Sequence, residues 1–235
     1  MRNNVDFLTI DNMDIFYPIN QKKDLIKRIS KEYLRGNLVD LGCGRMPYKS
    51  IIKEYSNVNN YVGIDIENEI YQKESKPDLF WDGNKIPVED NLYDSAILIE
   101  VLEHTPEPND VIKELNRVLK VDGYLLITVP FLWTLHDIPY DEYRYTPFGL
   151  ERILIQNGFE VEKMECFGGW NASMASMISL YVKRGVNKKY RKIFSRIMLP
   201  LVKYLMKKDQ KSDKSKFYEG QMITGIWCLA KKKDK

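Results

Sequence analysis

One stretch limits the possible folds of this chain more than any other, an apolar run that stops at a glycine turn. Residues 37–41, Asn-Leu-Val-Asp-Leu, have the pattern of a short buried strand, and the turn 42–44, Gly-Cys-Gly, follows at once. Glycine adopts backbone conformations that other residues avoid, so such a turn can bring its N–H groups against a ligand. A helix is predicted over 49–55 and a second strand over 61–66. This order predicts the first βαβ unit of an α/β protein.

The alternation of strands and helices continues along the chain. Parallel strands are joined by crossover connections, which are usually helices, so this order predicts a mostly parallel sheet with helices on both faces. The fold class is therefore α/β, with a Rossmann-like sheet of seven strands. Further strands are predicted over 79–81, 93–99, 124–129, 159–164 and 222–230, and further helices over 22–35, 110–119 and 147–157.

A single domain over residues 1–235 is expected, with its core at about 22–166 and 219–232. Residues 170–218 interrupt the alternation and are predicted as a basic helical insertion before the last strand. Within them, residues 183–216 hold 13 lysines and arginines against two aspartates, a local net charge of +11. The rest of the chain is then near −8, since the total is +3. The basic charge is thus concentrated in one segment.

An apolar stretch lies inside this basic insertion. Residues 193–205 are too few to cross a bilayer, and Pro200 interrupts them. Three placements are open for the insertion. It can contact an anionic membrane surface, cover the active site as a lid, or pack on the sheet with a solvated basic face.

Composition excludes several other classes of protein. The three cysteines are far apart and form no CxxC pair, so neither a disulfide framework nor a zinc site is indicated. The N-terminus lacks the basic start and apolar core of a secretory signal, and we expect a cytoplasmic protein, with contact to the inner membrane face as an option. Nucleic acid is not expected as a partner, because the net charge is small and aromatic residues are sparse among the basic ones.

The glycine turn and one acidic residue indicate a nucleotide site. In an open parallel sheet, ligands bind at the carboxyl ends of the strands, which is where the turn 42–44 lies. Asp65 follows Asp40 by 25 residues, at the end of the next strand, and can accept hydrogen bonds from ribose hydroxyls. NAD is the rival ligand, because dinucleotide oxidoreductases use the same turn and acid. A pyrophosphate, however, favours a full GxGxxG, and this chain has Met46-Pro47 after its second glycine.

Four segments in order give this pattern more specificity. They are LVDLGCG, YVGIDI, WDGNKIPVEDNLYDSAILIEVLEH and VIKELNRVLKVDGYLLITVP. Together they resemble the class I S-adenosylmethionine-dependent methyltransferases, in particular the group called the type 11 methyltransferase domain, over about residues 38–164. The chain departs from the family at Arg45-Met46-Pro47, where a further glycine is common. The resemblance implies S-adenosylmethionine as the cofactor and methyl transfer as the activity.

The resemblance also implies a role for individual residues. Asp40 and the glycine turn are expected to hold the methionine end of the cofactor, and Asp65 the ribose. Asp82 with Gly83 is expected at the adenine edge, and Glu100 beside the cofactor. The full expected cofactor set is Asp40, Gly42, Cys43, Gly44, Asp65, Ile66, Asp82, Gly83 and Glu100.

The segment 130–145, PFLWTLHDIPYDEYRY, is the expected acceptor site, because in similar proteins the region after the fifth strand faces the acceptor. Its aromatic rings can wall a pocket, although they can equally fill the core beneath a long loop. A hydroxyl acceptor benefits from a general base, and the candidates are His136 and His104, the second of which has loop orientation as its alternative role. The expected acceptor contacts are Trp133, Asp137, Tyr140, Tyr143 and Arg144.

The acceptor itself follows from the resemblance alone, which favours an oxygen of a small-molecule, sugar or lipid-linked compound. Glu100 and Glu103 are three residues apart, but no further converging ligands stand out in the sequence, so no metal site is expected. A second class of function stays open beside the enzyme, namely a non-catalytic nucleotide-binding protein that uses the basic insertion for contacts.

Overall fold

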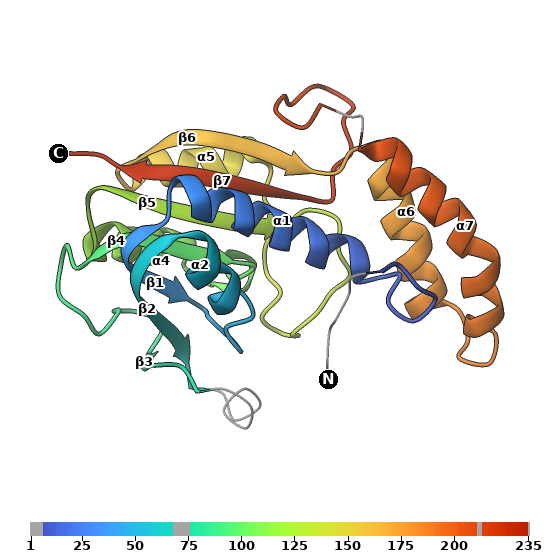
Figure 1. Ribbon diagram of the computed structural model, residues 1–235, viewed down its shortest axis with the longest axis horizontal. Helices are drawn as coiled ribbons and strands as arrows, with labels where there is room; N and C mark the ends of the chain where they lie inside the picture. Colours follow the sequence, from blue (N-terminus) through green and yellow to red (C-terminus); the bar gives the residue numbers. More distant parts are fainter. Residues whose placement is uncertain (1–6, 68–75, 211–212, 235) are drawn as a thin grey trace. The chain divides into compact units, whose positions relative to one another are not determined.

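The computed structural model describes residues 7–67, 76–210 and 213–234 (Figure 1). The chain divides into two compact units, which we call the sheet unit and the helical unit. The sheet unit holds Leu25–Pro130, Leu135–Met164 and Trp227–Lys235, and the helical unit holds Met1–Asp24, Phe131–Thr134 and Glu165–Ile226.

A seven-stranded sheet has the order β3-β2-β1-β4-β5-β7-β6. The pairs β1–β2, β1–β4, β2–β3 and β4–β5 are parallel. Figure 1 shows that β7 runs against β6, so the sheet is mostly parallel. The strands are β1 (Arg35–Leu41), β2 (Asn57–Ile66), β3 (Leu79–Trp81), β4 (Tyr93–Ile99), β5 (Leu119–Pro130), β6 (Phe159–Phe167) and β7 (Gly225–Lys232).

The strand order reverses between β1 and β4. The chain moves from β1 toward one edge of the sheet and from β4 toward the other, so right-handed crossovers put α2 and α4 on opposite faces. Such a reversal leaves a crevice at the carboxyl ends of the two strands. The predicted α/β fold is confirmed. The helices beside these strands are α1 (Phe16–Glu32), α2 (Lys49–Tyr55), α4 (Pro108–Val118) and α5 (Pro147–Gln156), and a 3-10 helix, η1, spans Leu102–His104.

The central strands explain why this part of the chain reads as near-continuous apolar runs. Residues 95–98 of β4 and 125–130 of β5 are buried throughout, as expected for parallel strands covered on both faces. On α4, the buried side chains recur at helical spacing and face the sheet, at Val111, Ile112, Leu115 and Val118.

The two largest errors in the predicted boundaries lie at the starts of β5 and α1, and sheet pairing explains the first. The strand predicted over 124–129 begins at Leu119, directly after α4 ends at Val118. Leu119 pairs with Tyr93 of β4, and Asp122 has a φ of +63°, so the segment joins the sheet through an irregular register. The other error concerns α1, which begins at Phe16 instead of residue 22.

The helical unit contains α6 (Trp170–Leu180), a π-helical turn η2 (Tyr181–Gly185) and α7 (Arg191–Asp209). The helical insertion predicted over 170–218 falls within this unit. Within the described ranges, no helix is both long enough and apolar enough to span a membrane. A compact apolar cluster joins the helices to residues near the N-terminus, made of Met13, Tyr17, Ala172, Ala175, Val182, Val202 and Met206.

A buried carboxylate at the end of α7 caps the start of α6. Asp209 is 1% exposed, and its Oδ1 accepts hydrogen bonds from the backbone N–H groups of Gly169 and Ala172, each at 3.0 Å. The hydroxyl of Tyr17 donates to the other carboxylate oxygen at 3.5 Å. A negative charge at a helix N-terminus is favoured by the free N–H groups there. Asp209 therefore fixes the two helices to each other.

We expect Asp209→Ala to lower the free energy of unfolding by about 2–4 kcal/mol, because two buried N–H groups lose a charged acceptor. Urea unfolding followed by far-UV circular dichroism measures this change. The control is Asp213→Ala, since Asp213 is exposed and accepts hydrogen bonds from Ser215 in its own loop. Equal stability of the two variants would contradict the capping role.

Candidate functional site

The glycine turn at the end of β1 has the geometry that the sequence predicts. Gly42 and Gly44 have φ angles of +70° and +50°, which other residues rarely adopt. A side chain on Gly42 would collide with Val101, whereas the space above Gly44 is open for 4 Å. The N–H groups of Gly42 and Cys43 donate to the carbonyl of Ile64 in β2, at 2.8 and 3.2 Å. The turn is thus tied to the neighbouring strand and leaves room for a ligand.

Asp65, the acid predicted to bind ribose, contacts this turn directly. Its Oδ2 accepts a hydrogen bond of 2.6 Å from the N–H of Gly44, and its Oδ1 accepts one of 2.8 Å from Ile66. Burial raises the pKa of Asp65, while the two backbone donors oppose that shift. The structure therefore places Asp65 and Gly44, which are 21 residues apart in sequence, at one point.

Asp40 is the most buried acid of this region, with 3% of its surface exposed. The hydroxyl of Tyr61 donates a hydrogen bond to its Oδ2. Burial raises the pKa of Asp40 to about 7, and the hydrogen bond from Tyr61 opposes the rise. A carboxyl group with this pKa changes its charge near neutral pH, so a cationic ligand at the site would favour the ionised form.

Two cavities lie at this edge of the sheet. The first has a volume of about 390 Å³ and brings together five of the predicted cofactor residues, Asp40, Gly42, Cys43, Gly44 and Glu100. The second, of about 710 Å³, is lined by Ile66, Phe80, Trp81 and Asp82 among others.

Asp82 lines the second cavity and forms a turn with Gly83. The Oδ1 of Asp82 accepts from the N–H groups of Asn84 and Lys85 at 2.8 and 3.0 Å, and these bonds lower the pKa of the carboxyl. Gly83 has a φ of +87°. At the first cavity, the hydroxyl of Thr128 donates to Glu100 at 2.9 Å.

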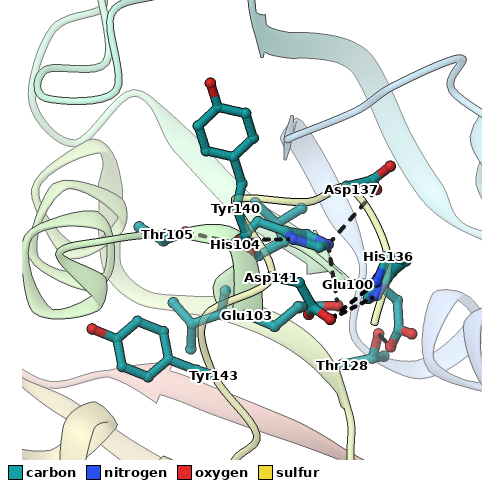
Figure 2. Close-up of polar contacts among 12 residues, drawn as sticks. Glu100, Glu103, His104, Thr105, Thr128, His136, Asp137, Tyr140, Asp141 and Tyr143 are labelled. Carbon is teal, nitrogen blue, oxygen red and sulfur yellow. Dashed lines mark hydrogen bonds and ion pairs between the residues drawn. The ribbon is translucent and has the colours of Figure 1, made fainter. Parts of the chain in front are cut away.

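The two candidate bases, His104 and His136, lie side by side (Figure 2). Their ring centroids are 4.6 Å apart, at an interplanar angle of 73°. His104 ends η1, and His136 lies in the loop after β5. Thirty-two residues of sequence separate them, so only the fold brings them together.

Glu103 is the residue of this cluster that the sequence analysis missed as part of a site. Its side chain is fully buried, and its Oε1 lies 3.9 Å from Nε2 of His104. Its backbone carbonyl accepts hydrogen bonds from the N–H groups of Glu142 and Tyr143, which hold the acceptor loop against η1. The premise that no ligands converge here is wrong, because single ligand atoms of Glu103, His104 and His136 lie within 4.8 Å of one another. The adjacent pair Glu103-His104 was the available signal.

The predicted acceptor residues divide between the two units. In the sheet unit, Arg144 forms a two-pronged ion pair with Asp141 at 2.6 and 2.8 Å, and Tyr140 is 63% exposed. The hydroxyl of Tyr143 donates to the carbonyl of Pro106 at 3.1 Å, and Asp137 lies 4.0 Å from His104. Trp133 belongs to the helical unit, where the guanidinium of Arg184 stacks 5.0 Å from its ring.

Comparisons with known proteins agree with this geometry. Residues 39–127 match the family model described as "Methyltransferase domain". A curated relative, an uncharacterized protein of Methanocaldococcus jannaschii, is 32% identical over 113 residues. That alignment spans 46% of this chain and 42% of the relative, so the chain matches less than half of that protein's length.

Solved structures share the fold at low sequence identity. A putative methyltransferase from Bacillus halodurans is 15% identical with a TM-score of 0.57, over 91% of this chain and 100% of that one. The cyclase SpnF is 16% identical with a TM-score of 0.59, over 92% and 81% of the two chains. A phosphoethanolamine N-methyltransferase of Haemonchus contortus, solved with S-adenosylmethionine, is 17% identical with a TM-score of 0.55, over 92% and 53%.

The sheet order, the glycine turn and Asp65 thus define an α/β domain whose strand ends have the architecture that nucleotide ligands use. Residues 39–127 match a methyltransferase domain, in agreement with the resemblance found in the sequence.

The raised pKa of Asp40 predicts a pH dependence of stability. A carboxyl whose pKa is higher in the folded chain binds more protons when folded, so its contribution is favourable at low pH and is lost as the pH rises through about 7. Wild-type protein should therefore lose more stability than Asp40→Asn between pH 5 and 8. The free energies of unfolding of the two proteins should diverge by at most about 1.4 kcal/mol per pH unit. Each kcal/mol corresponds to a shift of roughly 2–4 °C in the melting temperature. Thermal unfolding of the ligand-free proteins measures it, and parallel curves would refute the assignment.

Proposed function

We propose that this chain is an S-adenosylmethionine-dependent methyltransferase that acts on an oxygen of a small-molecule, sugar or lipid-linked acceptor. The observation that carries the proposal is the hydrogen bond between Gly44 N–H and Asp65 at the carboxyl edge of the sheet, beside a cavity lined by carboxylates. The family match over residues 39–127 supports the same activity.

The charges around the first cavity suit a cationic cofactor. S-adenosylmethionine carries a positive sulfonium and a positive amino group, and Asp40 and Glu100 both line the cavity. The open space above Gly44 lets a ligand approach the backbone closely. Asp65 would then accept from the ribose hydroxyls, and the second cavity, with Ile66 and Asp82, would receive the adenine.

When bound, the cofactor supplies an activated methyl group for direct displacement. The protein then has to align the acceptor, exclude water and, for a hydroxyl acceptor, remove a proton. His136 belongs to the segment predicted to face the acceptor, and His104 lies beside it. Two routes for the proton are available there: an imidazole can take it as a general base, or a metal ion held by the imidazoles can lower the pKa of the hydroxyl.

The alternatives differ in what the site would have to bind. An NAD-dependent oxidoreductase would place a pyrophosphate on the turn, but Met46, with a φ of +50°, and Pro47 follow where a glycine-rich loop would continue. A non-catalytic binding protein, or another reaction, is compatible with the fold alone, since a similar structure is a cyclase.

Binding of the cofactor is the direct test. We expect purified protein to bind S-adenosylmethionine and its demethylated product, but not NAD, in calorimetric titrations. Asp65→Ala should weaken binding by at least about 100-fold, because two hydrogen bonds to a charged group, worth about 1.5–3 kcal/mol each, are lost.

Asp24→Ala is the matched control, since Asp24 is an exposed aspartate of α1 outside the cavities, and it should bind as wild type does. If the cofactor binds, labelled methyl donor then screens the acceptor classes. Binding of NAD alone, or equal binding by Asp65→Ala and wild type, would overturn the proposal.

We further propose that the helical unit contacts an anionic membrane surface. Large apolar side chains on α6 and α7 are exposed at helical spacing, so each helix carries an apolar stripe. Ile197, for example, is 62% exposed. The stripe of α6 with the first residue of η2 is Trp170, Met174, Met177 and Tyr181, and that of α7 is Ile193, Ile197, Leu201 and Tyr204.

Basic residues supply the complementary charge. Exposed lysines and arginines flank the α7 stripe, and the segment around it has a net charge of +11. A basic residue near an anionic leaflet contributes about 1 kcal/mol, and an apolar stripe can enter the headgroup boundary. The exposed basic residues are Lys192, Arg196, Lys203, Lys207 and Lys208.

Vesicle flotation tests this contact. We expect binding to vesicles of phosphatidylcholine with phosphatidylglycerol, weaker binding to phosphatidylcholine alone, and a loss on adding salt. The double variant Ile197→Ser with Leu201→Ser should reduce binding at least tenfold, because it removes two apolar contacts with the lipid. Ile155→Ser is the control, since Ile155 is 57% exposed on α5 in the sheet unit. Flotation unchanged in the double variant would exclude the stripe as the contact.

A further inference from the structure

Both histidines of the chain meet at one point, together with a buried carboxylate. The sequence contains two histidines, His104 and His136, and single ligand atoms of these two and Glu103 lie within 4.8 Å of one another. The three residues come from η1 and from the loop after β5, which the bonds from Glu142 and Tyr143 to the Glu103 carbonyl hold together. Figure 2 shows the imidazoles and the carboxylate pointing toward one another.

The hydrogen bond of His104 fixes its tautomer. Its Nδ1 lies 3.1 Å from the carbonyl oxygen of Tyr140, and a carbonyl only accepts, so Nδ1 carries the proton. In the neutral ring, Nε2 then presents a lone pair. That atom faces the carboxylates of Glu103 at 3.9 Å and Asp137 at 4.0 Å. Electron-rich atoms converge here, and a shared cation would stabilise them.

A second group of residues supports His136 from behind. Its Nδ1 lies 3.2 Å from Oδ2 of Asp141, and its backbone N–H donates to the same oxygen. The guanidinium of Arg144 pairs with both oxygens of this carboxylate, at 2.6 and 2.8 Å. Metal-binding imidazoles commonly have their other nitrogen held by a carboxylate or a backbone carbonyl. His104 has such a partner in the carbonyl of Tyr140, and the carboxylate of Asp141 lies beside Nδ1 of His136.

We propose that Glu103, His104 and His136 bind one divalent transition-metal ion. Two imidazoles and one carboxylate suit zinc, iron, cobalt or nickel better than magnesium or calcium, which prefer oxygen ligands alone. Bonds of about 2.0–2.2 Å place the ligand atoms of one ion roughly 3–4 Å apart, so side-chain shifts of about 1 Å or less close the present spacing. The side chain of Asp137 is 65% exposed and lies 4.0 Å from Nε2 of His104.

The role of the ion rests on the proposed function. Three protein ligands leave a coordination position open, and an acceptor hydroxyl placed there would have a lowered pKa. The hydroxyl loses its proton to solvent, its oxygen bonds to the methyl carbon, and the carbon–sulfur bond breaks with its electron pair going to sulfur. The products are a methyl ether, the neutral thioether and one proton, so the charge balances.

Metal titration of the full chain tests the site without any acceptor. Chelator-treated protein is titrated by calorimetry with Zn²⁺, Co²⁺ and Mg²⁺ in turn. We expect one equivalent of Zn²⁺ or Co²⁺ and weaker binding of Mg²⁺. The visible spectrum of bound Co²⁺ should show nitrogen and oxygen ligands, and a thiolate spectrum from Cys43, Cys166 or Cys228 would overturn the assignment.

Variants locate the ion. His136→Ala and Glu103→Gln should each weaken binding at least tenfold, and Asp141→Asn by about tenfold, since it positions His136. Glu142→Gln is the matched control, because Glu142 is exposed in the same loop and loses the same charge. Thermal unfolding verifies that each variant is folded. Equal Zn²⁺ affinity in Glu103→Gln and wild type would overturn the site.

The same titrations separate this inference from the proposed function. Binding of S-adenosylmethionine by a protein that binds neither Zn²⁺ nor Co²⁺ would overturn the metal site alone and leave the imidazoles as bases. Metal binding with no cofactor binding would overturn the methyltransferase proposal alone. In the wild type, we expect both ligands to bind.

Discussion

The hydrogen bond from Gly44 to Asp65 is the interaction on which the proposed nucleotide site depends. It joins the end of β1 to the end of β2, and the turn also donates to the carbonyl of Ile64. Because the strands are parallel and adjacent, their carboxyl ends meet at one edge of the sheet. Strand pairing is therefore enough to bring polar groups at these ends together. The two cavities follow from this edge, since the residues that line them come directly after β1, β2, β3 and β4.

The proposed acceptor side is built differently. Its histidines come from separate segments, and backbone hydrogen bonds from Glu142 and Tyr143 to Glu103 hold one segment against the other. Burial of the Glu103 side chain and the ion pair of Arg144 with Asp141 give this region a fixed arrangement of charges. A cluster of this kind can orient an acceptor or hold an ion. Differences of about 1 Å in the distances between its ligand atoms decide which of the two it does.

The helical unit adds a second kind of constraint. Asp209 ties the start of α6 to the end of α7, and the apolar cluster around Tyr17 packs beneath them. With their inner faces used in this way, the helices leave apolar stripes and basic residues exposed. Soluble monomers rarely expose such stripes without a binding role, which connects the packing of this unit to its proposed membrane contact.

The sequence by itself determined the α/β class, the strand–turn–strand unit at residues 37–66, and Asp40, Gly44 and Asp65 as parts of one site. These are local features, because a strand end, a glycine turn and the next strand end lie within one βαβ unit. The tertiary structure decided the start of α1, the early start of β5, the division into two units and the meeting of Glu103 with both histidines. Such features depend on pairing and packing between distant segments, which periodicity along one segment does not encode.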